Sequence, residues 1–499
     1  MRFWKILVIC ILLVSENLSA RPADRYFFQY TADCAAAYDA YFSLQLPEGT
    51  AQLRRAAAAD PGNLMPVFLA DYEDCLLLML NGDRREYEQR RDRYDERLAW
   101  LDKGPDASPW KRLTRGVLHL HWALVHVRFG ERVKAALAFR KSYLNLKENA
   151  RLFPAFSPNK VFLGFEEAIA GTIPEDYRWI ASVFGVKGDV VKGVAAIGGF
   201  LEQNKAPQTA FRREAALFYT YLRFYLLQQQ EAAWKYVSSP DFGAADNLLN
   251  ALVAANIALN YRHADDALQY LRRAQRFPES RYFPVVDYEL GYALMYRLDG
   301  GAIAAFERYL ATSPGAWYRK DAAQKIAWMH LLQGRAAEAA EKLKRVRSTG
   351  NSFVDADKGA QRAAEAGMLP DPTLLAARLL CDGGYYAPAL QKLAALPPAL
   401  AQSPDRKLEY HFRAGRTYEG LGQYAKAFAH YSVAYEEGRG SREQFGARAA
   451  LQTAMLYEKT GDAAKARQWF DKTLALRSHD FQASIDQQAK AGLGRLGGS

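Results

Sequence analysis

The segment GRTYEGLGQYAKAFAHYSVAYEEG, from Gly415 to Gly438, places glycine and alanine where a helix usually carries leucine. Gly422, in its middle, can end one helix and let the next begin. Gly415 and Ala427 then fall where the two antiparallel helices touch, and their small side chains let the backbones approach closely. A glycine inside a helix costs about 1 kcal/mol relative to alanine, so its presence indicates that close packing needs the space. The segment therefore predicts a tight helical hairpin.

The same pattern returns along the second half of the chain. Gly384, Gly422 and Gly461 follow one another at intervals of 38 (422 − 384) and 39 (461 − 422) residues, and looser copies precede them. Intervals of about 34 to 40 residues with small and aromatic positions are typical of stacked helical hairpins. The residues predicted to pack these hairpins are Gly334, Ala339, Gly415, Tyr418, Gly422, Ala427, Tyr431, Ala434, Ala454, Tyr457, Gly461, Ala466 and Phe470.

These residues resemble tetratricopeptide repeats over the stretch 255–476, although the tryptophan expected near the start of each repeat is missing. The resemblance implies an all-α fold, a right-handed superhelical solenoid of antiparallel helix hairpins without significant β-sheet. Solenoids of this type present extended concave surfaces that bind other proteins. We expect a tetratricopeptide-like array at 231–490 and a flexible C-terminal tail at 491–499.

The first half of the chain, 21–230, shows helical periodicity with a less regular repeat, and is predicted to be an atypical helical-repeat region. The motif GVKGDVVKG at 185–193 and the helix FRKSYLNLKEN at 139–149 are similar to the inclusion-body-clearance family of tetratricopeptide proteins. That resemblance implies a helical fold and a non-enzymatic adaptor role, and it transfers no site residue.

The N-terminal twenty residues have the three parts of a secretory signal peptide. Arg2 and Lys5 precede an apolar run at 6–14, and a polar stretch ends in Ser19 and Ala20. The run is about half the ~20 residues that span a bilayer, so we expect cleavage near Ala20 and export. Export leaves Cys34, Cys75 and Cys381. Cys34 and Cys75 are a candidate disulfide, and buried free thiols are the favoured alternative.

The formal net charge of +11 does not predict a nucleic-acid partner, because the charges are scattered and mixed in sign. In Asp83–Arg97, for example, spacings of three and four residues bring opposite charges together on one helix, which is typical of a solvated face. No block of lysine and arginine marks a phosphate-binding surface.

No catalytic, metal-binding or cofactor-binding residue is predicted. His119 and His121 lie two residues apart, so they point to different faces of a helix, and no zinc, phosphate-loop or nucleophile-elbow motif is present. His330 occupies a repeat position where an aromatic side chain packs. A catalytic site assembled from carboxylates of distant repeats stays open.

The sequence thus predicts an exported, non-enzymatic scaffold or adaptor that binds protein or peptide partners in a bacterial-type cell envelope, with peripheral association with envelope membrane proteins. The alternative is a glycan- or nutrient-binding component of an uptake system. Aromatic residues could anchor either a peptide or a sugar on a concave surface, or simply fill the repeat core: Tyr219, Tyr221, Phe224, Tyr225, Trp317, Tyr318, Tyr385 and Tyr386. Partner identity and oligomeric state stay open.

Overall fold

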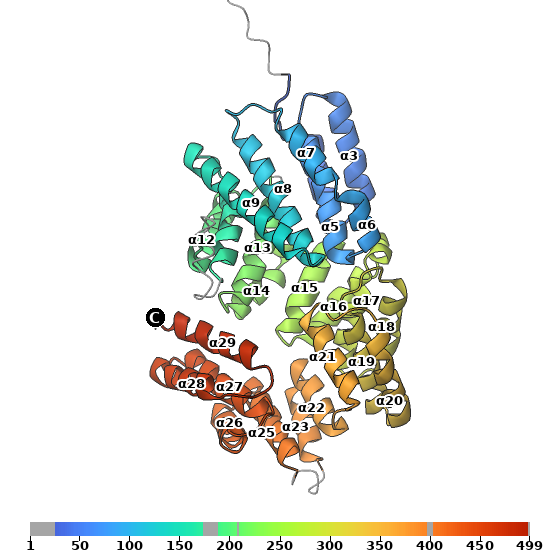
Figure 1. Ribbon diagram of the computed structural model, residues 1–499, viewed down its shortest axis with the longest axis vertical. Coiled ribbons are helices and arrows are strands. Elements are labelled where there is room, and N and C mark those ends of the chain that lie inside the picture. Colours follow the sequence, from blue (N-terminus) through green and yellow to red (C-terminus); the bar gives the residue numbers. More distant parts are fainter. Residues whose placement is uncertain (1–24, 173–187, 207–208, 397–402, 498–499) are drawn as a thin grey trace, which may run out of the picture. The chain divides into compact units, whose positions relative to one another are not determined.

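The computed structural model describes residues 25–172, 188–206, 209–396 and 403–497 (Figure 1). Every regular element in these ranges is a helix, and β-type pairing is confined to one isolated bridge between Phe27 and Asn63. The predicted all-α fold is therefore confirmed. The expected signal peptide and residues 185–187 of the GVKGDVVKG motif lie outside the described ranges. Within those ranges, no helix has both the length and the apolar character needed to cross a bilayer.

The chain forms two compact units, and the boundary between them differs from the prediction. Among the described residues, unit 1 comprises those up to Val253 together with Phe277–Phe283 and Pro314–Ala316, and unit 2 comprises the others from Ala254 onward. At the predicted boundary of 230/231, a helix begins at Gln230 and packs against the helix before it. The division falls instead inside helix α15 (Leu248–Asn260).

Unit 1 packs helices that follow one another in the chain, most extensively α8 against α9 and α10 against α12. Four short helices, α4 to α7, lie between the first hairpin and α8. The helices are α2 (Ala32–Tyr41), α3 (Leu46–Ala59), α4 (Met65–Leu69), α5 (Asp71–Asn81), α6 (Arg84–Arg90), α7 (Arg93–Leu101), α8 (Pro109–Arg128), α9 (Arg132–Leu152), α10 (Asn159–Ala170), α12 (Val190–Gln203), α13 (Arg212–Tyr225) and α14 (Gln230–Val237).

Close helix contacts in unit 1 depend on small residues, as the sequence pattern suggested for the second half. A Cβ added to Gly193 of α12 would lie 2.3 Å from the carbonyl oxygen of Gly164 on α10, so neither position has room for a side chain. Phe211, which is fully buried, lies edge-on to Tyr38, Phe68 and Phe162 with ring centroids 5.0–6.1 Å apart. Such ring pairs anchor the core of the unit.

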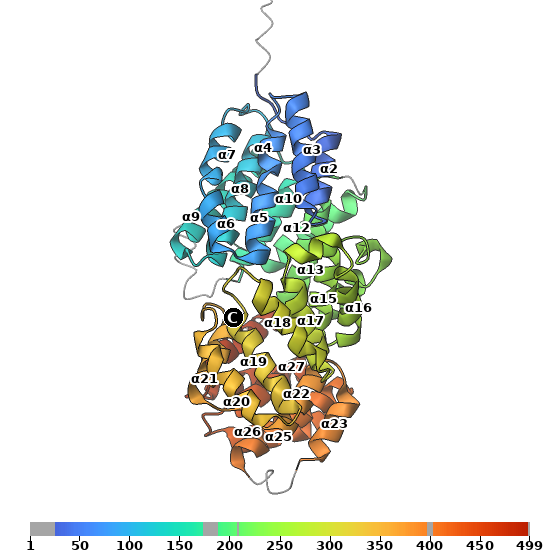
Figure 2. The same ribbon diagram turned by 90° about the vertical axis from the view of Figure 1, so that its right-hand side faces the viewer.

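Unit 2 is a succession of antiparallel hairpins, and Figure 2 labels its helices from α16 to α23 and from α25 to α27. The predicted hairpin architecture is confirmed within this unit. Its helices are α16 (Ala264–Ala274), α17 (Val285–Tyr296), α18 (Gly301–Thr312), α19 (Arg319–Leu332), α20 (Ala336–Arg345), α21 (Asp355–Ala366), α22 (Pro372–Asp382), α23 (Tyr386–Ala394), α25 (Pro404–Gly420), α26 (Tyr424–Gly438), α27 (Phe445–Lys459), α28 (Ala463–Ala475) and α29 (Gln482–Arg495).

Glycines with left-handed backbone conformation connect the two helices of several hairpins. Gly422 has φ +71° and Gly384 has φ +90°, values that a residue with a side chain adopts only with strain. Gly384 also approaches the chain closely, because an added Cβ would lie 2.1 Å from the carbonyl oxygen of Arg262. The α17–α18 loop lacks such a glycine, and Leu298 takes the left-handed conformation there (φ +59°).

The C-terminal segment from 491 to 495 is helical, so the predicted flexible tail is wrong over these residues. Gly492 of α29 packs against the ring of Phe470, where an added Cβ would come within 2.2 Å. Arg495 donates from Nε and Nη2 to the two carboxylate oxygens of Glu458, both at 2.7 Å. These contacts hold the end of α29 against the last hairpin.

Candidate functional site

In four hairpins of unit 2, the first helix runs into a turn that contains a glycine. These four first helices carry residues at equivalent positions on one face. Counting six residues back from Gly334, Gly384, Gly422 and Gly461 reaches Trp328 of α19, Arg378 of α22, Arg416 of α25 and Met455 of α27. Positions one helical turn away on α19 and α25 are Lys325 and Arg413. Because α22 packs beside α25, and α25 beside α27, the partly exposed Arg378, Arg413, Arg416 and Met455 lie on adjoining helices, whereas Trp328 and Lys325 are buried at the α19 end. We call these positions the first-helix face.

The first-helix face holds four guanidiniums, Arg378, Arg413, Arg416 and Arg448, which we call the arginine cluster. Glu409 accepts from Arg413 at 2.8 and 3.1 Å. Asp382 lies between two of the arginines, 3.6 Å from Arg378 and 4.0 Å from Arg416. Arg448 forms no ion pair with any described residue and donates to the neutral side chain of Gln444. The four cations of the cluster thus have only two carboxylates, Glu409 and Asp382, as ion-pair partners among the described residues.

The surplus of positive charge changes the acidity of Arg448. Burial lowers the pKa of Arg448, and the charges of Arg413 and Arg378 lower it further, so that it falls to about 10 although Asp382 opposes the change. Like charges in a partly desolvated position disfavour one another. Arg416 also has too few acceptors, because its buried Nε has no hydrogen-bond partner among the described residues.

Aromatic rings border the arginine cluster at both ends. On α19, Trp328 lies under Lys325 Nζ at 4.0 Å and under Arg378 Cζ at 5.2 Å. After α28, the half-exposed ring of Phe481 lies 5.6 Å from Arg448 Cζ and 4.9 Å from Arg362 Cζ. Rings beside cations favour ligands that combine negative charge with apolar groups.

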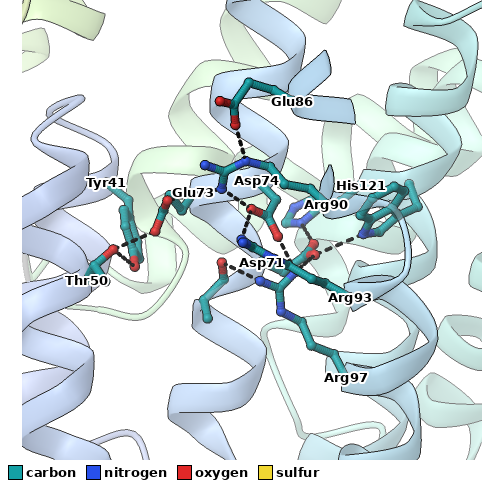
Figure 3. A network of polar contacts seen from close by, with 12 residues as sticks. Tyr41, Thr50, Asp71, Glu73, Asp74, Glu86, Arg90, Arg93, Arg97 and His121 are labelled. Carbon is teal, nitrogen blue, oxygen red and sulfur yellow. Dashed lines mark hydrogen bonds and ion pairs between the residues drawn. The ribbon is translucent and has the colours of Figure 1, made fainter. Parts of the chain in front are cut away.

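Unit 1 contains a second concentration of charge, in which every arginine has carboxylate partners (Figure 3). Asp71 of α5 accepts from Arg97 at 2.8 Å, from Trp122 Nε1 at 2.9 Å and is 2.9 Å from His121 Nδ1. Asp74 pairs with Arg93 at 2.9 Å. Burial alone would lower the pKa of Arg97, but the two aspartates outweigh it and raise that pKa above its ordinary value.

The rest of the unit 1 network extends this pairing across several helices. Arg90 pairs with Asp74, with Glu73 at 3.1 Å and with Glu86 at 2.7 Å. Glu73 also accepts from Thr50 of α3 at 2.5 Å. The network ties α3, α5, α6, α7 and α8 together. It has its own counter-charges and therefore suits a structural role.

His121 is the titratable centre of the unit 1 network. It lies between Asp71 and Glu214, whose Oε1 is 3.6 Å from His121 Nε2, and Tyr72 donates to Glu214 at 2.7 Å. Burial alone would lower the pKa of His121, but hydrogen bonds and charge from Asp71 and Glu214 raise it to about 9. The imidazolium is therefore a buried cation near neutral pH.

The structure gathers the predicted packing residues into hairpin interiors and turns. A Cβ added to Gly415 would lie 2.5 Å from the Tyr431 ring, so this glycine makes room for an aromatic residue of the next helix. Tyr418 is partly buried beside Ala427, Tyr431 and Ala434. A second cluster joins Ala454, Ala466 and Phe470 with the partly buried Tyr457, and Ala339 is fully buried on α20. Gly334, Gly422 and Gly461 have φ values of +76°, +71° and +85°.

The candidate disulfide is absent from the structure, where Cys34, Cys75 and Cys381 are free. Burial raises the pKa of the Cys34 thiol and of the Cys75 thiol, and both then resist forming the reactive thiolate. They pack as small apolar residues of α2 and α5. This arrangement agrees with the alternative favoured from the sequence, that of buried free thiols.

Most of the aromatic residues noted in the sequence are partly buried, and Tyr225 is exposed. Phe224 is buried, Tyr221 and Tyr225 stack with ring centroids 5.9 Å apart, and Trp317 stacks on Phe353 at 5.3 Å. Tyr219 lines a shallow hollow with Arg212 and other residues. His330 is buried 2.9 Å from Glu338. The described residues contain no group of three or more histidine, cysteine, aspartate or glutamate side chains that could hold a metal ion.

Two features of the charged sites were not predicted from the sequence. The arginine cluster is assembled from three helices whose arginines are separated by tens of residues, and the only available signal was their offset from the turn glycines. The charges of Asp83–Arg97 were expected to form a solvated face. Instead, Arg90 and Arg97 turn inward to Asp71 and Asp74, which precede that run in a different helix.

No protein-family model matches the chain, and no curated protein matches it. The resemblance to the inclusion-body-clearance family therefore has no support from relatives. Among solved structures, a Naa15/Naa10 complex bound to HypK-THB is similar at 15% identity, covering 93% of this chain and 72% of that one with a TM-score of 0.21. Yeast Tom70 is similar at 13% identity, covering 85% of this chain and 96% of that one, also with a TM-score of 0.21.

Proposed function

We propose that the chain is an exported, non-enzymatic helical-repeat scaffold of the cell envelope, and that the first-helix face of unit 2 binds an acidic segment of a protein partner. The observation that carries the proposal is the arginine cluster, in which four guanidiniums face two carboxylates and the pKa of Arg448 falls to about 10. A carboxylate from outside would supply the counter-charge that the cluster lacks.

The chemistry of the cluster suits binding. Arginine presents a planar fork of N–H donors that holds a carboxylate through two parallel hydrogen bonds. Even with a pKa near 10, Arg448 stays protonated at neutral pH, so it acts as a fixed charge and not as a proton donor. The half-exposed ring of Phe481 can cover an apolar side chain that flanks the acidic residues.

The binding proposal is tested by fluorescence anisotropy with two labelled peptides that differ only in Glu-to-Gln replacements. We expect the acidic peptide to bind and the neutral one not to bind. Arg448→Gln and Arg413→Gln should each weaken binding about tenfold to a hundredfold, because a hydrogen bond to a charged group contributes about 1.5–3 kcal/mol. Arg308→Gln, on α18 and paired with Asp287, is the matched control and should leave the affinity unchanged.

Equal weakening by Arg308→Gln would show that overall charge, not the cluster, attracts the peptide. Export and envelope location are a separate part of the proposal, and N-terminal sequencing of the protein recovered outside the cytoplasm tests it. Crosslinking in the envelope fraction should then capture a membrane-associated protein partner. Stabilisation by soluble oligosaccharides in a thermal-shift panel would favour the glycan-binding alternative.

A further inference from the structure

The outward side of α9 combines exposed apolar side chains with a high density of positive charge. Val133, Leu137 and Leu144 are 75%, 49% and 37% exposed, which is unusual for large aliphatic residues. At about 100° per residue, the three lie within about 40° of one another around the helix. They form one stripe that runs along the helix.

The opposite side of α9 is fully used by the fold. Ala135, Ala138, Ser142, Leu146 and Asn149 are buried where α9 packs along α8, its neighbour in Figure 1, and against α10. The orientation of the apolar stripe is therefore fixed by internal packing. The stripe faces away from the core because the other side of the helix is already committed.

Positive charge flanks the stripe on both sides. Six lysines and arginines and a single acidic residue lie within α9. Glu148 pairs with Arg151 at 2.7 Å, and Glu131, just before the helix, pairs with Lys134 at 2.9 Å. Arg132, Lys141 and Lys147 are exposed and form no ion pair with a described residue.

We propose that the outward face of α9 docks unit 1 onto the surface of an anionic lipid bilayer. Aliphatic side chains enter the boundary between headgroups and acyl chains, while cations remain at the level of the anionic headgroups. A nucleic acid would satisfy the cations and leave the aliphatic stripe in water. A lipid surface uses both the cations and the aliphatic stripe, and it adapts to the convex side of a helix.

The test measures partition of the full chain onto vesicles of pure phosphatidylcholine and onto vesicles that also contain 30% phosphatidylglycerol, by co-sedimentation. The readout is the ratio of the two partition coefficients, which cancels binding that does not depend on lipid charge. We expect Arg132→Gln/Lys141→Gln/Lys147→Gln to lower the anionic-to-neutral ratio about a hundredfold, since each cation near the surface contributes about a factor of five. Val133→Ser/Leu137→Ser/Leu144→Ser, which keeps all charges, should weaken binding to the anionic vesicles.

The matched control is Lys342→Gln/Lys344→Gln/Arg345→Gln on α20, which removes three positive charges from exposed or partly exposed positions of unit 2. The proposal expects this variant to bind like the unmodified chain. It is overturned if the control lowers the ratio as much as the α9 charge variant, if anionic lipid does not increase binding, or if the serine variant binds as well as the unmodified chain. Circular dichroism of each variant checks folding, and the charge variant decides the outcome if the serine variant unfolds.

Discussion

Arg97 in unit 1 and Arg448 in unit 2 are both largely removed from water, yet their pKa values move in opposite directions. Arg97 lies between Asp71 and Asp74, whose negative charges more than offset the effect of burial. Arg448 lies near Arg378 and Arg413, and its pKa falls to about 10. The same residue type therefore stabilises the fold in one unit and leaves an unsatisfied charge in the other.

The difference separates structural charge from charge available for recognition. A buried cation with its own carboxylates gains little from a ligand, because its hydrogen bonds are already made. A cation crowded by other cations gains from any anion that arrives. The unit 1 network and the arginine cluster can therefore be distinguished by experiments in which the same change has opposite consequences.

The largest contrast is expected from replacing each arginine by glutamine. Arg97→Gln leaves Asp71 and Asp74 buried with less counter-charge, and should lower the free energy of unfolding by about 3–5 kcal/mol. Arg448→Gln removes repulsion from the arginine cluster, and should be neutral or stabilise by up to about 1 kcal/mol. Urea unfolding gives both values, and hydrogen exchange locates the change in α5 or in α27. A similar loss in the two variants would contradict the comparison.

The second contrast concerns pH and His121. Its pKa in the folded protein is raised to about 9 from an ordinary 6.5, so the stabilisation is fully present below pH 6.5 and is lost as the pH rises through 9. The total is on the order of 3 kcal/mol. Unfolding free energy measured from pH 6 to 9.5 should fall in the unmodified chain.

His121→Asn should be less stable at pH 6, because it removes the hydrogen-bonding cation between Asp71 and Glu214. The variant should also show a smaller fall of unfolding free energy between pH 6 and 9.5. His411 of unit 2 provides the opposite control. Burial and the neighbouring His430 lower the pKa of His411 to about 4, so its effect appears as destabilisation when the pH falls below 6.5. If His411→Asn, and not His121→Asn, removed the fall in unfolding free energy above pH 6.5, the assignment of that fall to His121 would be contradicted.

A third test alters the balance inside the arginine cluster. Asp382→Asn removes one of its two carboxylates, so it should lower stability by up to about 1 kcal/mol while tightening binding of the acidic peptide severalfold. The change in affinity opposes the change in stability, which a general loss of structure would not produce. Asp287→Asn, which leaves Arg308 of α18 without its partner, serves as the control and should not tighten binding.

The sequence allowed the hairpins of unit 2 to be predicted because their determinants are local. Gly415 and Tyr431 are sixteen residues apart (431 − 415), and the turn at Gly422 brings them together. The charge networks depend on tertiary contacts instead. Asp71 meets Arg97 and His121 from three helices, and nothing in the spacing of these residues distinguishes an inward arginine from a solvated one.

The C-terminal helix was not predicted, because its contacts are tertiary. Residues 491–495 are rich in glycine and small side chains, which favours a tail when the segment is considered alone. Phe470 and Glu458, both in the preceding hairpin, supply the ring and the carboxylate that fix it. Local propensity is overridden where a neighbouring helix offers contacts that the propensity cannot include.

The smallest expected effect is the response of the two networks to salt. Screening weakens repulsion between the partly exposed cations of the arginine cluster, so raising sodium chloride from 0.05 to about 0.5 M should stabilise unit 2 by less than about 1 kcal/mol. The buried pairs of unit 1 are screened far less and should change little. Hydrogen exchange of α27 against α5, measured at both salt concentrations, resolves the difference. Arg448→Gln should remove the gain in α27, because the repulsion that salt relieves is then absent; a gain that persisted in this variant would place its origin outside the arginine cluster.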